Sequence, residues 1–175
     1  MAIAQREGQL HRNFQGYTTK PESDLFGFGM TSISMLHDVY VQNHKRIKDY
    51  YQAIDAGKLP LEKGVSLSRD DILRRTVIME LMCQFRLRQA DLEAKYRLGF
   101  DLDFDSYFSH EIDRLKALEA DRLIQVLADG IEVTPTGRLL IRNIASVFDS
   151  YVNYQTLILS DRVLASKFIG NSNDS

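Results

Sequence analysis

One long helix, expected from about Arg69 to Phe85, constrains the fold of this chain more than any other feature of its sequence. Ser68 and Asp71 have the spacing of a capping box, with Asp in place of the commoner Glu, and this pair marks the helix start. Apolar residues form two adjacent ridges along the helix: Leu73, Val77, Leu81 and Phe85 in one, and Ile78 and Met82 in the other. Because a helix that is apolar over most of its circumference needs cover on several sides, we expect it to be central and buried.

The elements expected after this helix are, in order, a short helix, a longer helix, a hairpin and a last helix, at 89–96, 103–119, 123–133 and 135–148. The hairpin is indicated by Asp129–Gly130, a dipeptide that tolerates the positive φ angles of a two-residue turn. The last helix is indicated by Thr134–Pro135, a cap followed by proline at the first helical position. This order is typical of a winged-helix module, which we place at 68–150.

The residues before this module carry shorter signals. A helix is expected at 44–56, and Gly57 lies where such a helix stops. The stretch 38–43 is expected to be a short connector, and 59–67 an extended linker between two parts of the chain.

Two apolar runs between residues 11 and 36 are interrupted by Gly27 and Gly29. Glycine in an apolar run lets another backbone or a ligand come close, because no side chain stands in the way. The uncharged polar groups nearby would suit a neutral or zwitterionic ligand. Residue types alone favour the other interpretation, a strand, a tight turn and a close packing contact.

The charge of the winged-helix region argues against nucleic acid as a partner. From Ser68 to Asp149 there are 12 Lys plus Arg residues against 15 Asp plus Glu residues, and the net charge of the whole chain is −2. Duplex affinity comes mainly from neutralising phosphates, so an acidic module gains little of it. We expect no nucleic acid and no membrane among its partners, since no run approaches the roughly 18 apolar residues of a spanning helix. The first residues lack a signal peptide, which favours the cytoplasm.

Few residues are candidates for chemistry. The single cysteine, Cys83, excludes a disulfide within the chain and any multi-cysteine metal or iron–sulfur site made by this chain alone, and it is interpreted as a core residue. The four histidines lie too far apart for the usual spacings of metal sites: His11, His37, His44 and His110. Arg138 and Arg142, one helical turn apart, could hold a carboxylate, although a solvated face or a contact with a neighbouring domain is the commoner role of such a pair.

Four stretches together closely resemble the C-terminal part of oxygen-independent coproporphyrinogen III oxidases, which are radical S-adenosylmethionine enzymes of haem biosynthesis. They are His11–Thr19, Gly27–Met35, Ser68–Asp71 and Gly137–Ile144, and the resemblance runs from about Ala2 to about Tyr151.

This resemblance implies an enzyme that converts two propionates of coproporphyrinogen III to vinyl groups, giving protoporphyrinogen IX. It implies an N-terminal radical S-adenosylmethionine barrel that binds a [4Fe–4S] cluster through three cysteines. It also implies that Phe14, Gln15 and Ile33 line the site of a second S-adenosylmethionine beside the substrate. The helical module would then cover the barrel opening, and Arg138 and Arg142 would be candidate contacts to substrate carboxylates.

The chain departs from the family in lacking the cluster motif, so we expect the isolated chain to be inactive. It is either a fragment of a longer enzyme or the partner of a separate N-terminal polypeptide. The alternative is a non-catalytic winged-helix module that binds a partner protein or a tetrapyrrole.

The expected fold class is α+β, mainly helical, with a winged-helix-like module preceded by a strand and helix remnant of an α/β barrel. The expected parts are the barrel remnant, the linker, the module, and a last helix with a disordered tail, at 1–58, 59–67, 68–150 and 151–175. Unpaired strand edges in the remnant favour self-association.

Overall fold

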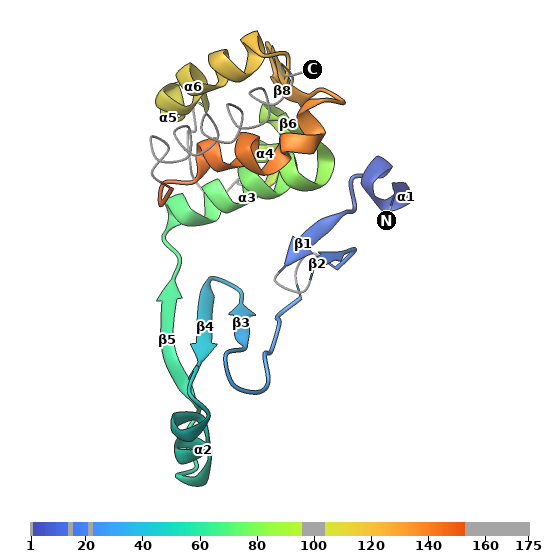
Figure 1. The fold of residues 1–175 in the computed structure, drawn as a ribbon. Coiled ribbons are helices and arrows are strands. Elements are labelled where there is room, and N and C mark those ends of the chain that lie inside the picture. The colour runs from blue at the N-terminus through green and yellow to red at the C-terminus, as the bar shows by residue number, and fades with distance from the viewer. Residues whose placement is uncertain (1, 14–15, 21–22, 96–103, 153–175) are drawn as a thin grey trace, which may run out of the picture. The chain divides into compact units, whose positions relative to one another are not determined.

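The structure is a computed structural model that describes residues 2–13, 16–20, 23–95 and 104–152 (Figure 1). The chain divides into two compact units, Met1–Leu87 and Arg88–Ser175. Both units contain helices and strands, in agreement with the expected α+β class. The winged-helix arrangement and the domain limits stay predictions, and the expected last helix and tail lie outside the described residues from 153 onward.

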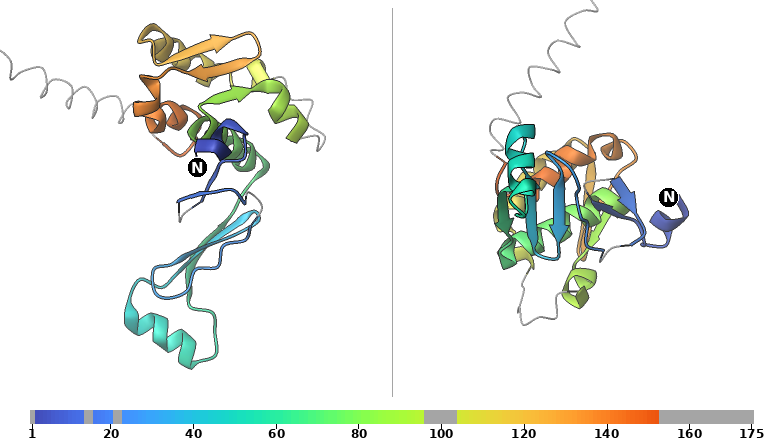
Figure 2. Two further views of the ribbon diagram at one scale, coloured as in Figure 1. Left: turned by 90° about the vertical axis from the view of Figure 1, so that its right-hand side faces the viewer. Right: turned by 90° about the horizontal axis from the view of Figure 1, so that it is seen from below.

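The first unit contains two small antiparallel sheets. Its elements are α1 (Ala2–Arg6), β1 (His11–Asn13), β2 (Gly16–Thr18), β3 (Ile33–Leu36), β4 (Val39–Asn43), α2 (Ile47–Asp55), β5 (Leu61–Ser66) and α3 (Arg69–Gln84). Strands β1 and β2 form a hairpin in which His11 lies opposite Thr18. The second sheet has the order β3-β4-β5, and α2 connects β4 to β5 beyond one end of this sheet (Figures 1 and 2).

Two segments expected to be connections are strands of the second sheet. The expected connector 38–43 contains β4, and the expected linker 59–67 contains β5, which pairs with β4 along its length. All six residues of β5 are exposed, so its sequence has no alternation of buried and exposed positions. The expected linker is extended, but its conformation is fixed by hydrogen bonds to β4, the strand that precedes α2 in the sequence.

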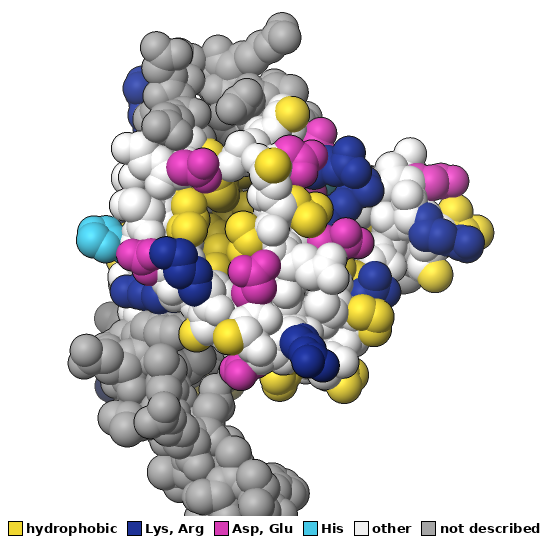
Figure 3. All heavy atoms as spheres, turned by 90° about the horizontal axis from the view of Figure 1, so that it is seen from above, with side chains coloured by type: hydrophobic (Ala, Val, Ile, Leu, Met, Phe, Trp, Pro, Cys, Tyr) yellow, Lys and Arg dark blue, Asp and Glu magenta, His cyan; other side chains and the backbone are white. Residues whose placement is uncertain are grey.

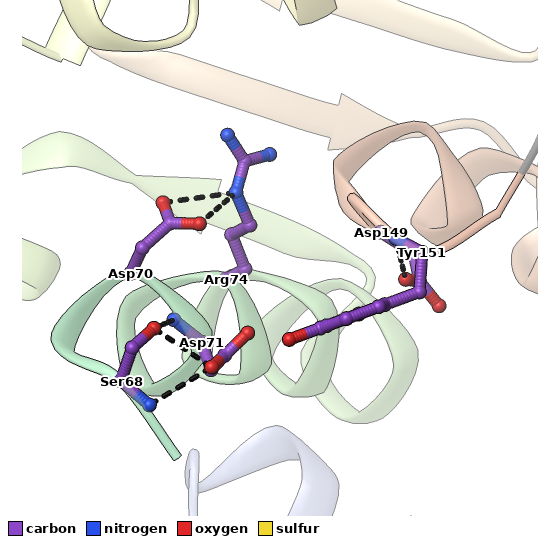
Figure 4. Close-up of polar contacts among 6 residues, drawn as sticks. All are labelled: Ser68, Asp70, Asp71, Arg74, Asp149 and Tyr151. Carbon is purple, nitrogen blue, oxygen red and sulfur yellow. Dashed lines mark hydrogen bonds and ion pairs between the residues drawn. The ribbon is translucent and has the colours of Figure 1, made fainter.

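Helix α3 is the long helix expected from the sequence, one residue shorter at its end. The Ser68 hydroxyl accepts a hydrogen bond from the Asp71 amide at 3.1 Å, and the Asp71 carboxylate accepts one from the Ser68 amide at 2.8 Å (Figure 4). One turn into the helix, the Arg74 guanidinium lies 2.9 Å from the Asp70 carboxylate. Leu73, Val77 and Leu81 are buried, which confirms the principal ridge. Phe85 leaves the ridge because it is the C-cap, with a left-handed φ of 57°.

The remaining strand β6 (Arg86–Arg88) spans the limit between the units, and the sheet to which it belongs has the order β6-β8-β7. The second unit itself consists of α4 (Gln89–Lys95), α5 (Phe104–Tyr107), α6 (Ser109–Ala120), β7 (Ile124–Leu127), β8 (Gly130–Val133), η1 (Gly137–Leu140), α7 (Ile141–Ala145) and η2 (Ser146–Phe148). The expected hairpin is confirmed, although Leu127 pairs with Gly130, so the turn residues are Ala128 and Asp129.

The last expected helix, 135–148, is broken into three short pieces. A Cβ atom on Gly137 would lie almost on the carbonyl oxygen of Leu123, so the chain packs here backbone against backbone. A regular helix is interrupted at Leu140, whose φ and ψ are −111° and 22°. These short helices still contribute to a buried core. In it, the ring of Phe148 contacts that of Phe108 edge to face, with 5.3 Å between the ring centroids.

Candidate functional site

Of the three residues expected at the second S-adenosylmethionine, the structure describes Ile33. Phe14 and Gln15 lie outside the described residues. Ile33 begins β3, lies opposite Gln42 in β4 and is half-buried. A partly exposed apolar side chain at this position is compatible with a ligand contact.

The segment that leads into Ile33 is a tightly folded loop. The Gly27 amide donates a hydrogen bond to the Ser34 hydroxyl at 3.0 Å. A Cβ atom on Gly27 would lie 2.7 Å from the carbonyl oxygen of Ile33, which is closer than such contacts occur. The close packing contact expected from the glycines is therefore present at Gly27.

Asn43 joins the separate turns of this loop, here defined as Gly27–Ser32. Its side chain is buried, and its amide nitrogen donates to the carbonyl of Gly29 at 2.9 Å and the hydroxyl of Ser32 at 3.0 Å, with a longer contact of 3.4 Å to the Gly27 carbonyl. Its backbone amide donates to the Ser32 carbonyl at 3.0 Å. One side chain thus holds both ends of the Gly27–Ser32 loop.

The loop contains a strained residue. Thr31 has a φ of 64°, a left-handed value that a β-branched residue adopts at a cost. Its amide donates to the His44 carbonyl at 3.0 Å, and its carbonyl accepts from the Gln42 side chain at 3.1 Å. Such strain persists where the surroundings over-determine the backbone, and it clusters at ligand sites.

Large apolar side chains alternate with the glycines of this segment and face solvent. Phe26, Phe28 and Met30 are 63%, 92% and 43% exposed. Gly27 makes the close inner contact while these three side chains remain uncovered, which is the pattern of a surface that another molecule or chain segment covers.

Arg138 and Arg142 do not share one regular helix. Arg138 lies in η1 and Arg142 in α7, and both side chains are exposed. The break at Leu140 removes the regular spacing from which a joint carboxylate site was derived. Their role at a substrate carboxylate stays a prediction.

Cys83 is a core residue, as expected. It is 1% exposed and packs with Ala4 and Leu10. Burial, and to a lesser extent the charge of Glu80, raise the pKa of the Cys83 thiol to about 11, against a small opposing effect of Arg12. A buried thiol with that pKa does not suit a metal or cluster ligand.

The described residues contain no group of three or more His, Cys, Asp or Glu side chains that could hold a metal ion. Within the same part of the chain, no helix combines the length and the apolar character needed to cross a bilayer.

Charged side chains of both signs are interspersed on the face seen in Figure 3, with hydrophobic side chains gathered between them. No extended basic patch lies among the described atoms of that face. The expectation that the chain does not bind nucleic acid stays a prediction.

Residues 67–140 match the family model described as the HemN C-terminal domain. This segment, from just before α3 to the end of η1, is therefore similar to the HemN C-terminal domain, in agreement with the resemblance noted from the sequence.

Three relatives match a longer part of the chain, and each of them is named oxygen-independent coproporphyrinogen III oxidase. The protein of Synechocystis is 65% identical over 152 residues, and that of Escherichia coli K12 is 49% identical over 152 residues; each match covers 87% of this chain but 33% and 32% of the relative. The protein of Thermostichus vulcanus is 52% identical over 157 residues, which are 89% of this chain and 47% of the relative. The chain spans about a third to a half of the curated relatives it matches.

A solved structure shares the fold. It is described as coproporphyrinogen III oxidase (HemN) from Escherichia coli, a radical SAM enzyme, and it matches with a TM-score of 0.81 at 49% identity over 86% of this chain and 34% of that chain. The mixed helix and strand architecture of both units is thus that of the HemN enzyme.

Asn43 is the residue of this site that the sequence did not reveal. It ends a short strand, and nothing in its neighbours marks it as buried. It is buried through its hydrogen bonds to the Gly29 carbonyl and the Ser32 hydroxyl, which lie 14 and 11 residues away in the sequence.

Proposed function

We propose that this chain is the C-terminal part of an oxygen-independent coproporphyrinogen III oxidase of haem biosynthesis. The assembled enzyme would convert two propionate side chains of coproporphyrinogen III to vinyl groups by oxidative decarboxylation, giving protoporphyrinogen IX. Its remaining part would be a radical S-adenosylmethionine barrel, joined covalently or supplied as a separate polypeptide. The expected location of this enzyme is the cytoplasm.

The observation that carries this proposal is the 65% identity to the Synechocystis oxidase over 152 residues. The TM-score of 0.81 agrees with it, since the backbone of this chain follows that of the solved structure over 86% of this chain. The similarity extends well before residue 67, so it includes the loop and the strand that bear the candidate site.

The chain itself does not fit an iron–sulfur cluster. A [4Fe–4S] cluster of this family needs three cysteine thiolates, whereas the chain has one cysteine and its thiol is buried and protonated at neutral pH. We therefore assign the cluster to the N-terminal part and expect the isolated chain to be inactive.

S-adenosylmethionine is the cofactor for which this chain would supply contacts. Phe14, Gln15 and Ile33 are the proposed contacts to a second S-adenosylmethionine, which would supply further radical-generating chemistry beside the substrate. The chain's own task would be to bind and orient this molecule and to exclude water from the reaction. Arg138 and Arg142 are proposed contacts to substrate carboxylates.

A chimera tests this function directly. The matched 152 residues of the Synechocystis oxidase are replaced by the corresponding residues of this chain, and anaerobic conversion of coproporphyrinogen III is measured with added S-adenosylmethionine and reductant. We expect the chimera to form the divinyl product and the isolated chain to form none. A cluster-loaded, folded chimera without product would refute the proposal.

Haem titration of the isolated chain addresses the alternative function. Tight, saturable haem binding together with an inactive chimera would favour a non-catalytic module that binds a tetrapyrrole. Absence of haem binding with an active chimera would leave the oxidase as the function of this chain.

A further inference from the structure

We propose that Asn43 is the positioning residue of the candidate S-adenosylmethionine site. Its carboxamide holds the Gly27–Ser32 loop in its strained conformation, and the loop in turn places Ile33 against a ligand. This inference rests on the proposed function, but the part that concerns the loop can be measured without it.

The hydrogen bonds of Asn43 reach both ends of the loop. The side-chain nitrogen is within 3.0 Å of the Gly29 carbonyl and the Ser32 hydroxyl, and the Ser32 hydroxyl itself donates to the Gly29 carbonyl at 2.7 Å. Asn43 is 6% exposed, so water does not compete freely for the groups that form these hydrogen bonds. Hydrogen bonds in a buried network are worth more than exposed ones, and a missing donor there leaves oxygens unpaired.

Asn43 is the last residue of β4 and lies beside an irregularity of the sheet. Its neighbour Gln42 pairs with Lys63 of β5, whereas Asn43 pairs with Leu61, so the extra residue of the bulge is Glu62 in β5. Gln42 is half-buried and makes one hydrogen bond, to the Thr31 carbonyl. Two neighbouring carboxamide side chains therefore contact the same loop, one buried with several hydrogen bonds and one half-buried with a single hydrogen bond.

The position of the loop determines the position of Ile33, because the loop and the Ile33 backbone are in tight contact. Ile33 directly follows Ser32, and its carbonyl lies against Gly27, where a Cβ atom would not fit. A shift of the loop must therefore move the backbone of Ile33. Displacements of about 1 Å at a binding group can lower catalytic efficiency by up to about a hundredfold.

Hydrogen exchange on the complete 175-residue chain tests whether Asn43 holds the loop. In Asn43→Asp, the amide nitrogen with its two donor hydrogens is replaced by one carboxylate oxygen that faces the Gly29 carbonyl, so we expect the amides of Gly27 and Thr31 to exchange at least about tenfold faster, with the amides of α3 unchanged. Asn43→Ala removes the donors without adding charge and should act in the same direction. The matched control, Gln42→Ala, should change the loop amides less than about threefold.

Turnover of the chimera tests the consequence for ligand binding. In Asn43→Asp and Asn43→Ala, we expect the KM for S-adenosylmethionine to rise about tenfold while kcat changes less than about threefold. Asn43→Gln, which keeps both donors on a longer side chain, should recover part of the loss. A purely structural role of Asn43 would change the amount of folded enzyme but not its KM.

The outcomes separate the two proposals. Unchanged exchange of the loop amides, or faster exchange with an unchanged KM, would overturn the positioning role while the oxidase function stands. An inactive chimera carrying the unaltered Asn43 would refute the proposed function and the ligand part of this inference together. Faster exchange with a raised KM would support both.

Discussion

At the scale of single residues, the Thr31 backbone shows where this chain stores strain. A left-handed φ of 64° costs a β-branched residue about 1–2 kcal/mol, and in this conformation the Thr31 amide donates to the His44 carbonyl. Thr31 lies in the Gly27–Ser32 loop, directly before Ser32, whose hydroxyl accepts a hydrogen bond from the Asn43 side chain. The strain and the Asn43 contacts therefore occur at the same place.

Replacing Thr31 by glycine should release this strain. Because glycine adopts positive φ freely but loses more chain entropy on folding, we expect Thr31→Gly to stabilise the first unit by about 0.5–1 kcal/mol. Thr31→Ala is the matched control, since alanine is also strained at this φ, and it should leave stability nearly unchanged. Urea unfolding of both variants measures the difference, and a destabilised glycine variant would contradict this interpretation of Thr31.

The Cys83 thiol predicts how stability depends on pH. Its pKa is raised from 9.0 to about 11 in the folded chain, so the folded thiol stays protonated where the unfolded one ionises. Folding then favours the protonated form, and the contribution of Cys83 to stability is complete below pH 9 and is lost as the pH rises from about 9 to about 11. A difference of about two pKa units corresponds to about 2–3 kcal/mol.

Chemical denaturation between pH 8 and pH 11 would measure this effect, with Cys83→Ala as the control that lacks the thiol. The loss of stability with rising pH should be smaller in the control. Equal losses in both proteins would show that other groups cause the alkaline destabilisation. Alkylation at pH 8 gives a second readout, because the folded thiol should react only after unfolding.

At the scale of elements, those with a local start or stop signal were predictable from the sequence. The capping box of Ser68 and Asp71 gave α3, and Gly57, with its φ of 68°, gave the end of α2. The Asp129–Gly130 pair indicated the hairpin, although the pairing of Leu127 with Gly130 shifts its turn by one residue. Each of these signals lies within a few residues of the boundary that it determines.

Elements fixed by distant contacts were missed. Strand β5 is a strand because it pairs with β4 across α2, and its own side chains carry no buried face. The last helix is interrupted at Leu140, and its first piece begins where Gly137 packs against the backbone of Leu123, a contact that no periodicity reveals. The candidate site follows the same rule: Ile33 came from a resemblance, while the role of Asn43 depends on contacts with a loop that lies 11 to 16 residues away in the sequence.

The capping box gives a prediction for the stability of α3. Ser68→Ala removes the acceptor for the Asp71 amide and the partner of its carboxylate, so we expect the free energy of unfolding to fall by about 1 kcal/mol. Asp113→Asn is the control, because it removes an exposed ion pair with Lys116 and should leave the urea midpoint unchanged. An unchanged midpoint in Ser68→Ala would show that packing alone fixes the start of α3.

At the scale of the whole molecule, the chain exposes several large apolar side chains outside the candidate site. Ile47, Tyr51 and Ile54 lie at helical spacing along α2 and are 58%, 56% and 45% exposed, in addition to the side chains of the loop. Because the chain spans about a third of the Synechocystis and Escherichia coli relatives, we infer that the remaining part of such an oxidase covers these groups. The expected self-association of the isolated chain has the same physical cause and stays a prediction.

The initial rate of the chimera tests the central claim most directly. Protoporphyrinogen IX formation and carbon dioxide release are followed together, with the intact Synechocystis oxidase as reference and the oxidase truncated before the matched segment as the blank. We predict a rate within about tenfold of the reference and two carbon dioxide molecules per product, because 65% identity preserves the site and its packing. A folded, cluster-loaded chimera no faster than the truncated blank would contradict the account.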